Sequence, residues 1–189
     1  EVQRINDPGV PFVWTLMPSN DGGHFLGTGN DGKVLRVTKS GESSVFFDSA
    51  EMEVHALAPA PNGGVYVGTS PDGRIYKVDS RGESSTFFDP DEKYIWSLAV
   101  DAKGVLYAGT GDKGNVYRIT SDGKGDRLFA TKTTHASTLA IDTSGQLLVG
   151  GRRLRLLDAP LDLADGVEIL VDPRSIRRAD RVLQARDVV

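Results

Sequence analysis

Four residues that recur at a fixed step of 41 positions have side chains suited to binding: Trp14, His55, Trp96 and Ser137. Two indole rings and an imidazole can stack on a flat ligand, hold a cation against their faces, or anchor a partner protein. Side chains at equivalent positions come together when repeats close around an axis. We therefore predict that these four surround one axial opening. The structural alternative is that they plug this opening or cover the next repeat.

A second kind of chemistry would use histidines or carboxylates. The histidines His24, His55 and His135 occupy different places in their repeats, so they are not expected to converge on zinc. Carboxylates between repeats offer oxygen ligands for a hard cation such as calcium, and the weak candidates are Glu51, Glu53, Asp91 and Glu92. Acidic loop residues are more often solvated. We expect no catalytic residue, no cofactor and no tightly bound transition metal.

The elements that must position these side chains follow the same step of 41 residues. Gly-Thr occurs at Gly27-Thr28, Gly68-Thr69 and Gly109-Thr110, and a glycine turn follows each pair. A period near 40 residues built of short strands and glycine turns is typical of a β-propeller blade. We expect these glycines to permit close backbone approach between blades. The threonine hydroxyls are expected to be hydrogen-bonded beside the turns.

The repeats predict an all-β propeller with four-stranded blades, each running from an inner to an outer strand. The second repeat gives these strands at 54–58, 65–69, 74–79 and 84–88. Four blades are predicted, at about 13–48, 54–89, 95–131 and 136–173. In the last blade the third strand is expected at 154–158 and the outer strand at 167–171. Apolar layers between blades are expected from Leu16, Leu57, Leu98 and Leu139, and from Phe47, Phe88 and Phe129.

Both ends depart from the repeat. Residues 1–8 align with the outer strand of a preceding or incomplete blade. Residues 174–189 form a basic tail, for which a short C-terminal helix is the first interpretation and a damaged inner strand the second. The surplus outer strand predicts that the four blades are part of a larger propeller, or half of a ring of about eight blades that two copies close.

Composition excludes several classes of function. The formal net charge is −4, so no overall basic field would attract nucleic acid. Cysteine is absent, which excludes disulfides, thiolate metal sites and a cysteine nucleophile. No run approaches the roughly 18 apolar residues of a membrane helix, so no membrane span is expected. The glycine-rich segment 27–32 joins two strands and lacks the helix start of a phosphate-binding loop.

The third repeat carries a resemblance to a known family. Its segments 95–101, 104–110 and 114–119 resemble repeats of bacterial NHL-type and two-component-regulator-type propellers. That resemblance implies a sensor or binding module of six or seven blades, often extracytoplasmic, in the periplasm or secreted. Gluconolactonases and related lyases share the architecture, but their metal-binding acidic and amide residues have no secure counterparts here. Trp-Asp dipeptides are absent, so the similarity to WD-repeat scaffolds is weaker.

These observations favour a non-enzymatic module that binds a partner protein or a small ligand at the channel mouth and the loops around it. The first alternative is an enzyme of the metal-dependent lactonase or lyase type. The second is a structural fragment of a larger multidomain protein.

Overall fold

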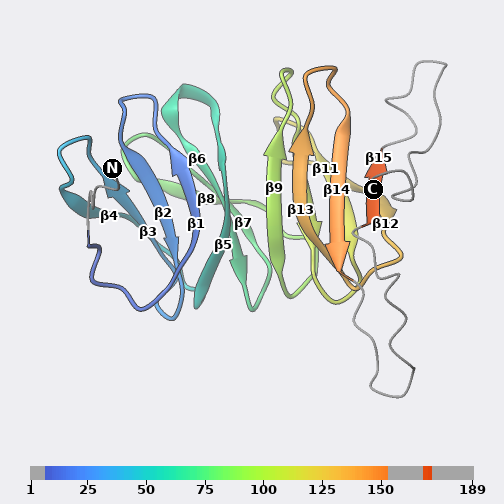
Figure 1. Cartoon of the computed structure of the whole chain (residues 1–189), viewed down its shortest axis with the longest axis horizontal. Helices are drawn as coiled ribbons and strands as arrows, with labels where there is room; N and C mark the ends of the chain where they lie inside the picture. Colours follow the sequence, from blue (N-terminus) through green and yellow to red (C-terminus); the bar gives the residue numbers. More distant parts are fainter. Residues whose placement is uncertain (1–6, 153–167, 172–189) are drawn as a thin grey trace, which may run out of the picture.

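The computed structural model describes residues 7–152 and 168–171, which form antiparallel sheets standing side by side (Figure 1). The first sheet contains β1 (Val13–Pro18), β2 (His24–Thr28), β3 (Lys33–Val37) and β4 (Ser43–Asp48). The second contains β5 (Glu53–Pro59), β6 (Val65–Ser70), β7 (Ile75–Val78) and β8 (Ser84–Phe88), with the short 3-10 helix η1 (Pro61–Gly63) between its first two strands. The third contains β9 (Ile95–Val100), β10 (Leu106–Thr110), β11 (Asn115–Ile119) and β12 (Gly125–Ala130). The fourth contains β13 (His135–Ile141), β14 (Leu147–Arg152) and β15 (Glu168–Val171).

Each sheet is one propeller blade, and its strands pair in chain order from the inner strand outward. The inner strands β1, β5, β9 and β13 contact one another in sequence, so the blades follow each other in one row. The all-β propeller architecture predicted from the repeat is confirmed. Antiparallel pairing places the first residues of the inner strands at the same end as the turns between second and third strands. We call this end of the blades the head end.

The turns between second and third strands show why glycine recurs there. Gly73 has a φ of +58°, and a Cβ added to it would lie 1.9 Å from the Glu92 carbonyl oxygen in the loop that leads to the next blade. Gly32 and Gly114 approach the following loops in the same way. Only glycine satisfies both the backbone angle and the close contact. The turn glycine is therefore part of the contact between blades.

The Gly-Thr pairs have the two roles predicted for them. Gly68 leaves room for the next blade, because a Cβ added to it would lie 2.6 Å from Cγ2 of Ile95. The Thr69 hydroxyl donates to the Arg74 carbonyl oxygen at 3.0 Å across the turn. The equivalent threonines of the first and third blades make the same bond.

The hydrophobic core is divided among the spaces between neighbouring blades. Val54 of the second blade packs with Phe25 of the first, and Ile95 of the third packs with Tyr66 of the second. These clusters include the predicted leucines of the second to fourth blades and the predicted phenylalanines of the first to third blades: Leu57, Leu98, Leu139, Phe47, Phe88 and Phe129. Each blade is thus stabilised mainly by its neighbours.

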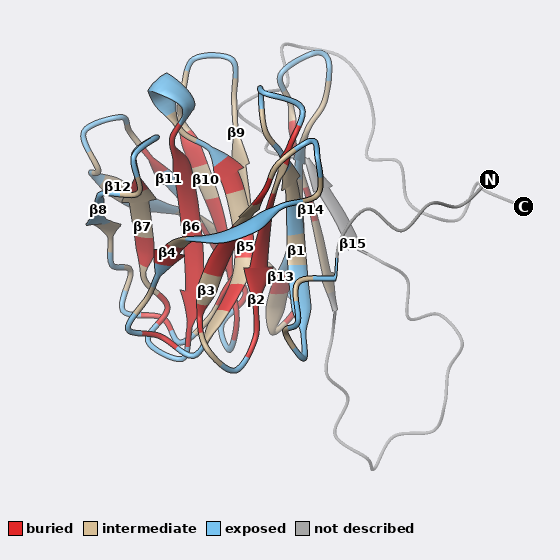
Figure 2. Cartoon of the chain, turned by 90° about the vertical axis from the view of Figure 1, so that its left-hand side faces the viewer, coloured by how far each residue is buried: buried red, intermediate tan, exposed pale blue. Residues whose placement is uncertain are grey.

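Leu16 does not follow this pattern, and the expectation that it joins a buried layer is wrong. Its side chain is 60% exposed. The equivalent leucines face the preceding blade, and within the described residues no blade precedes the first one. Figure 2 shows β1 mostly in pale blue, whereas β2, its neighbour in the sheet, is mostly buried. We call this side of the first blade the open face.

The fourth blade differs from the prediction in its strand order. β15 pairs directly with β14, so 168–171 takes the place beside the second strand that was predicted for 154–158, at the edge of the described sheet. An apolar strand can pair with any free edge, and the sequence does not say which edge it takes. The predicted strand at 154–158, residues 1–6 and the tail 174–189 lie outside the described residues.

Among the described residues, no helix has the length and apolar character needed to cross a membrane.

Candidate functional site: an aromatic rim at the head end

All four residues predicted to face the axis lie at a β-bulge near the start of an inner strand. Between β1 and β2 the register shifts on either side of Trp14, which is the extra residue. The same shift brackets His55 in β5, Trp96 in β9 and Ser137 in β13. A bulge removes one residue from the regular pairing and redirects its side chain. The recurring bulge is therefore the element that positions these side chains.

The bulges bring three of the four predicted residues into one row of rings. The ring centroids of Trp14 and His55 are 5.7 Å apart, and those of His55 and Trp96 are 4.4 Å apart. Ser137 is exposed at the equivalent bulge of the fourth blade and adds no ring. The row continues instead with His135, which meets Trp96 edge-on at 5.9 Å.

Two further rings extend the row, and the sequence analysis missed both. Phe12 stacks on Trp14 with centroids 5.4 Å apart, and Tyr94 stacks on Trp96 at 5.3 Å. Phe12 and Tyr94 lie two positions before the bulge residues and share the step of 41, which was the available signal. Residues i and i+2 of an extended strand lie on one side. The six rings together are called the aromatic rim: Phe12, Trp14, His55, Tyr94, Trp96 and His135.

The second blade replaces the stacked pair with a hydrogen-bonded pair. Glu53 occupies the position of Phe12 and Tyr94, and its Oε2 accepts hydrogen bonds from His55 Nε2 at 2.9 Å and from the Ser70 hydroxyl at 3.1 Å. Burial lowers the pKa of His55, and this effect outweighs the opposing effect of Glu53. The imidazole is therefore neutral at pH 7, and the Glu53 carboxylate lacks a charged partner in this ring.

This cluster does not have the arrangement of a serine nucleophile. The Ser70 hydroxyl lies 3.0 Å from His55 Nε2, the same nitrogen that faces Glu53. A Ser-His-acid triad needs its hydroxyl and its acid on opposite nitrogens of the imidazole. Ser70 is also only 1% exposed. The geometry fixes the imidazole between two indoles and does not activate Ser70 as a nucleophile for acyl transfer.

The residue after each Gly-Thr pair is complementary in size to the side chain at the bulge of the same blade. A Cβ added to Gly29 would lie 2.4 Å from Trp14 Nε1, and one added to Gly111 would lie 2.4 Å from Trp96 Nε1. The indoles therefore lie against the turn backbone, where a larger residue has no room. In the second blade the smaller imidazole leaves space for Ser70, which hydrogen-bonds to it.

Glu51, a weak metal candidate, is a buried link between a loop and the second blade. Its carboxylate accepts from the Asp72 backbone N–H at 3.0 Å and from the Arg74 guanidinium at 3.1 Å. Its side chain is only 3% exposed. Both partners lie in or beside the turn of the blade that follows the loop. Glu51 therefore holds the connecting loop against that turn.

Glu92 has the same role one repeat later. It accepts from the Asn115 side-chain amide at 2.6 Å and from the Tyr117 hydroxyl at 3.0 Å. Burial and this hydrogen bond raise the pKa of Tyr117 to about 12. Of the other two candidates, Glu53 bonds to His55 and Asp91 is exposed. The described residues contain no group of three or more His, Asp or Glu side chains that could hold a metal ion.

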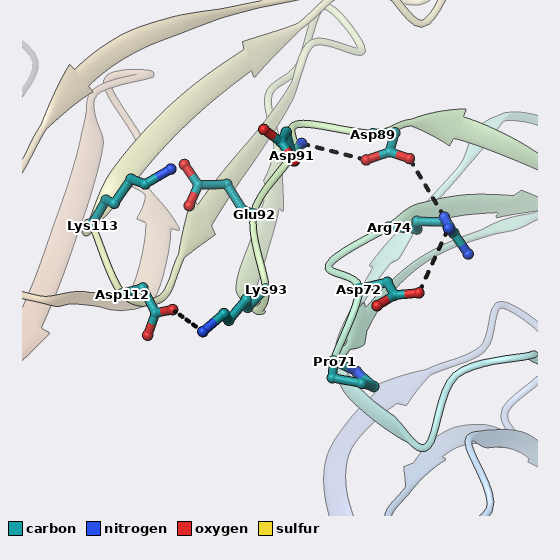
Figure 3. A pocket seen from close by; sticks show the side chains of 9 residues that line it. All are labelled: Pro71, Asp72, Arg74, Asp89, Asp91, Glu92, Lys93, Asp112 and Lys113. Atoms are coloured by element: carbon teal, nitrogen blue, oxygen red, sulfur yellow. Dashed lines mark hydrogen bonds and ion pairs between the residues drawn. The ribbon is translucent and has the colours of Figure 1, made fainter.

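A polar pocket of about 440 Å³ opens at the head end, between the second and third blades (Figure 3). Five carboxylates and three basic side chains line it, together with one proline: Pro71, Asp72, Arg74, Asp89, Asp91, Glu92, Lys93, Asp112 and Lys113. Arg74 approaches Asp89 at 3.4 Å, and Lys93 approaches Asp112 at 3.4 Å. The lining thus has more acidic than basic groups. Pro71 follows Ser70 and Lys93 precedes Tyr94, so the pocket adjoins the rim along the chain.

No known family model and no curated protein matches the chain. Among solved structures, it is similar to virginiamycin B lyase from Staphylococcus aureus, with a TM-score of 0.66 and 18% identity over 74% of this chain and 50% of that one. It is similar to a chain of the nidogen/laminin complex, with a TM-score of 0.64 and 17% identity over 74% of this chain and 57% of that one. It is also similar to the extracellular domain of BT4673 from B. thetaiotaomicron, with a TM-score of 0.62 and 19% identity over 76% of this chain and 21% of that one.

These similarities show the β-propeller fold, which a lyase and proteins of other kinds share. The chain spans between 21% and 57% of the length of these three proteins. At such identities the similarity is to the fold alone, so the function has to be argued from the site.

Proposed function

We propose that this chain is a non-enzymatic binding module, and that its ligand or partner docks on the aromatic rim. The observation that carries the proposal is the recurring bulge, which directs side chains from three consecutive blades into one row of rings. Aromatic side chains offer a large contact area, and they anchor many interfaces. Phe12 and Trp14 are 46% and 48% exposed, so part of the rim is available to a ligand.

The polar pocket beside the rim supports the same proposal. Binding sites combine apolar surface with a few polar groups that fix the orientation of the ligand. Here the rings supply the apolar surface, and the carboxylates and bases of the pocket supply the polar groups. A ligand longer than a single ring can use both.

A probe screen read by tryptophan fluorescence tests the proposal. The chain has two tryptophans, Trp14 and Trp96, and both belong to the rim, so bound probes should change the emission. We expect binding to be weakened several-fold in Trp14→Leu and in Phe12→Leu. Binding should persist in Val45→Ala, a matched control at a 56% exposed apolar residue of the outer strand β4. Probes that bind both rim variants as well as the unchanged protein would contradict the proposal.

An activity of the lactonase or lyase type would also contradict it. The fold is shared with virginiamycin B lyase, so the test is worth making directly. The purified protein is incubated with calcium or magnesium and a panel of lactones, and product is measured against a protein-free control. We expect no difference. Turnover that is abolished in Glu51→Gln or Glu53→Gln would establish the enzyme instead.

A further inference from the structure

We propose that the aromatic rim binds a rounded organic cation, of the quaternary ammonium class. This inference rests on the proposed function and names the ligand class of the same site. It follows from the orientation of the rings, the charge of the residues around them, and the position of the adjacent pocket.

The ring planes are not coplanar across blades, which favours a rounded ligand. Trp14 and His55 are inclined by 41°, and His55 and Trp96 by 46°. His135 stands at 88° to Trp96. A flat ligand stacks best on one continuous plane, whereas a tetrahedral cation can meet several inclined faces at once. The negative face of each ring attracts such a cation.

The charge around the rim has the sign that a cation requires. Each blade contributes two positions to the rim. Over the four blades these eight positions carry a single carboxylate and no lysine or arginine: Phe12, Trp14, Glu53, His55, Tyr94, Trp96, His135 and Ser137. The carboxylate is Glu53, whose side chain is 30% exposed. Its partner His55 is neutral at pH 7, because burial lowers the pKa of the imidazole. An anion would therefore meet an uncompensated negative charge here.

The pocket beside the rim adds further negative charge. Its five carboxylates exceed its three basic side chains. Arg74 and Lys93 are paired with Asp89 and Asp112, so neither presents a free positive charge to a ligand. The charge of the pocket lining therefore has the sign that a cation on the rim requires.

The experiment compares choline with 3,3-dimethylbutan-1-ol, which has the same shape but no charge. Binding is followed by tryptophan fluorescence at constant ionic strength, with sodium chloride replacing choline chloride. We expect saturable binding of choline, about tenfold tighter than that of the neutral alcohol, which is the ratio that a cation–π contribution of ordinary size gives. Equal affinity for the two would overturn the cation class while leaving the rim as a binding site. Binding of neither would overturn this inference, whereas the rim proposal is tested separately by the probe screen.

Variants separate the rings from the carboxylate. Trp14→Leu removes the most exposed indole, and Glu53→Gln removes the charge at nearly constant size. Each should weaken choline binding several-fold, and Glu53→Gln should leave the neutral alcohol unaffected. Trp96 still reports binding when Trp14 is replaced, and circular dichroism verifies the fold. Val45→Ala should bind as the unchanged protein does. Choline binding that is insensitive to both rim variants would overturn the inference.

Discussion

Val13 and Val54 are of the same residue type and occupy equivalent positions in consecutive repeats, yet Val13 is 43% exposed and Val54 is fully buried. The difference lies in their neighbours. Val54 faces the first blade, and Val13 lies on the open face. Ile95 and Ala136, at the next two equivalent positions, are also fully buried. A repeat thus specifies a surface that can be buried, and the preceding blade determines whether it is.

The largest effect is expected at the contact between a turn and the next loop. Gly73→Ala should cost at least about 3 kcal/mol of unfolding free energy, because the new Cβ adds a clash with the Glu92 carbonyl oxygen to an unfavourable positive φ. Gly104→Ala is the matched control. It also has a positive φ, but open space around it, so it should cost only about 1 kcal/mol. Denaturant unfolding measures both, and equal losses would show that the contact contributes little.

The two valines give a direct test of the comparison between covered and open faces. Val54→Ala should cost about 2 kcal/mol, because it leaves a cavity between blades. Val13→Ala deletes the same atoms from the open face and should cost about 0.5 kcal/mol. Urea unfolding of both variants measures the difference. Similar losses would mean that Val13 is covered in solution.

The open face should also make copies of the chain associate. Exposed apolar patches drive association, and this face combines Val13 with Leu16, which are 43% and 60% exposed. We expect the mean mass from light scattering to rise with protein concentration, and Leu16→Asp to suppress that rise. Val45→Asp, at an exposed residue of the outer strand, should not suppress it. A compact monomer at every concentration that binds no hydrophobic dye would contradict this expectation.

The smallest effect is expected from His55. Burial lowers its pKa below the ordinary value of 6.5, so the unfolded chain takes up the proton first as the pH falls. The contribution to stability is therefore present above pH 6.5 and is lost progressively below it. Thermal unfolding from pH 7.5 to 5 should show a smaller loss in His55→Gln. The control His24→Gln, at the opposite end of the first blade, should keep the loss seen in the unchanged protein.

Spacing alone was enough to predict the blades and to relate three rings of the aromatic rim to one another. The step of 41 residues identified Trp14, His55 and Trp96 because it fixes equivalence between blades. It did not reveal the bulge, since an extra residue leaves no mark in a pattern that every repeat shares. The step also relates Phe12 to Tyr94, but equivalence between blades does not show which rings of one blade stack on each other. The buried roles of Glu51 and Glu92 were also out of reach, because a loop carboxylate looks the same in sequence whether it is solvated or bonded.

The match between the bulge residue and the residue after Gly-Thr has a consequence for how such a protein can change. Trp14 requires Gly29, Trp96 requires Gly111, and His55 is completed by Ser70. Exchanging one member alone gives either a clash or a hydrogen-bonding group without its partner. Moving a whole segment of 41 residues carries both members together. Duplication and recombination of intact blades can therefore alter the rim one ring at a time, whereas single substitutions must pass through a destabilised intermediate.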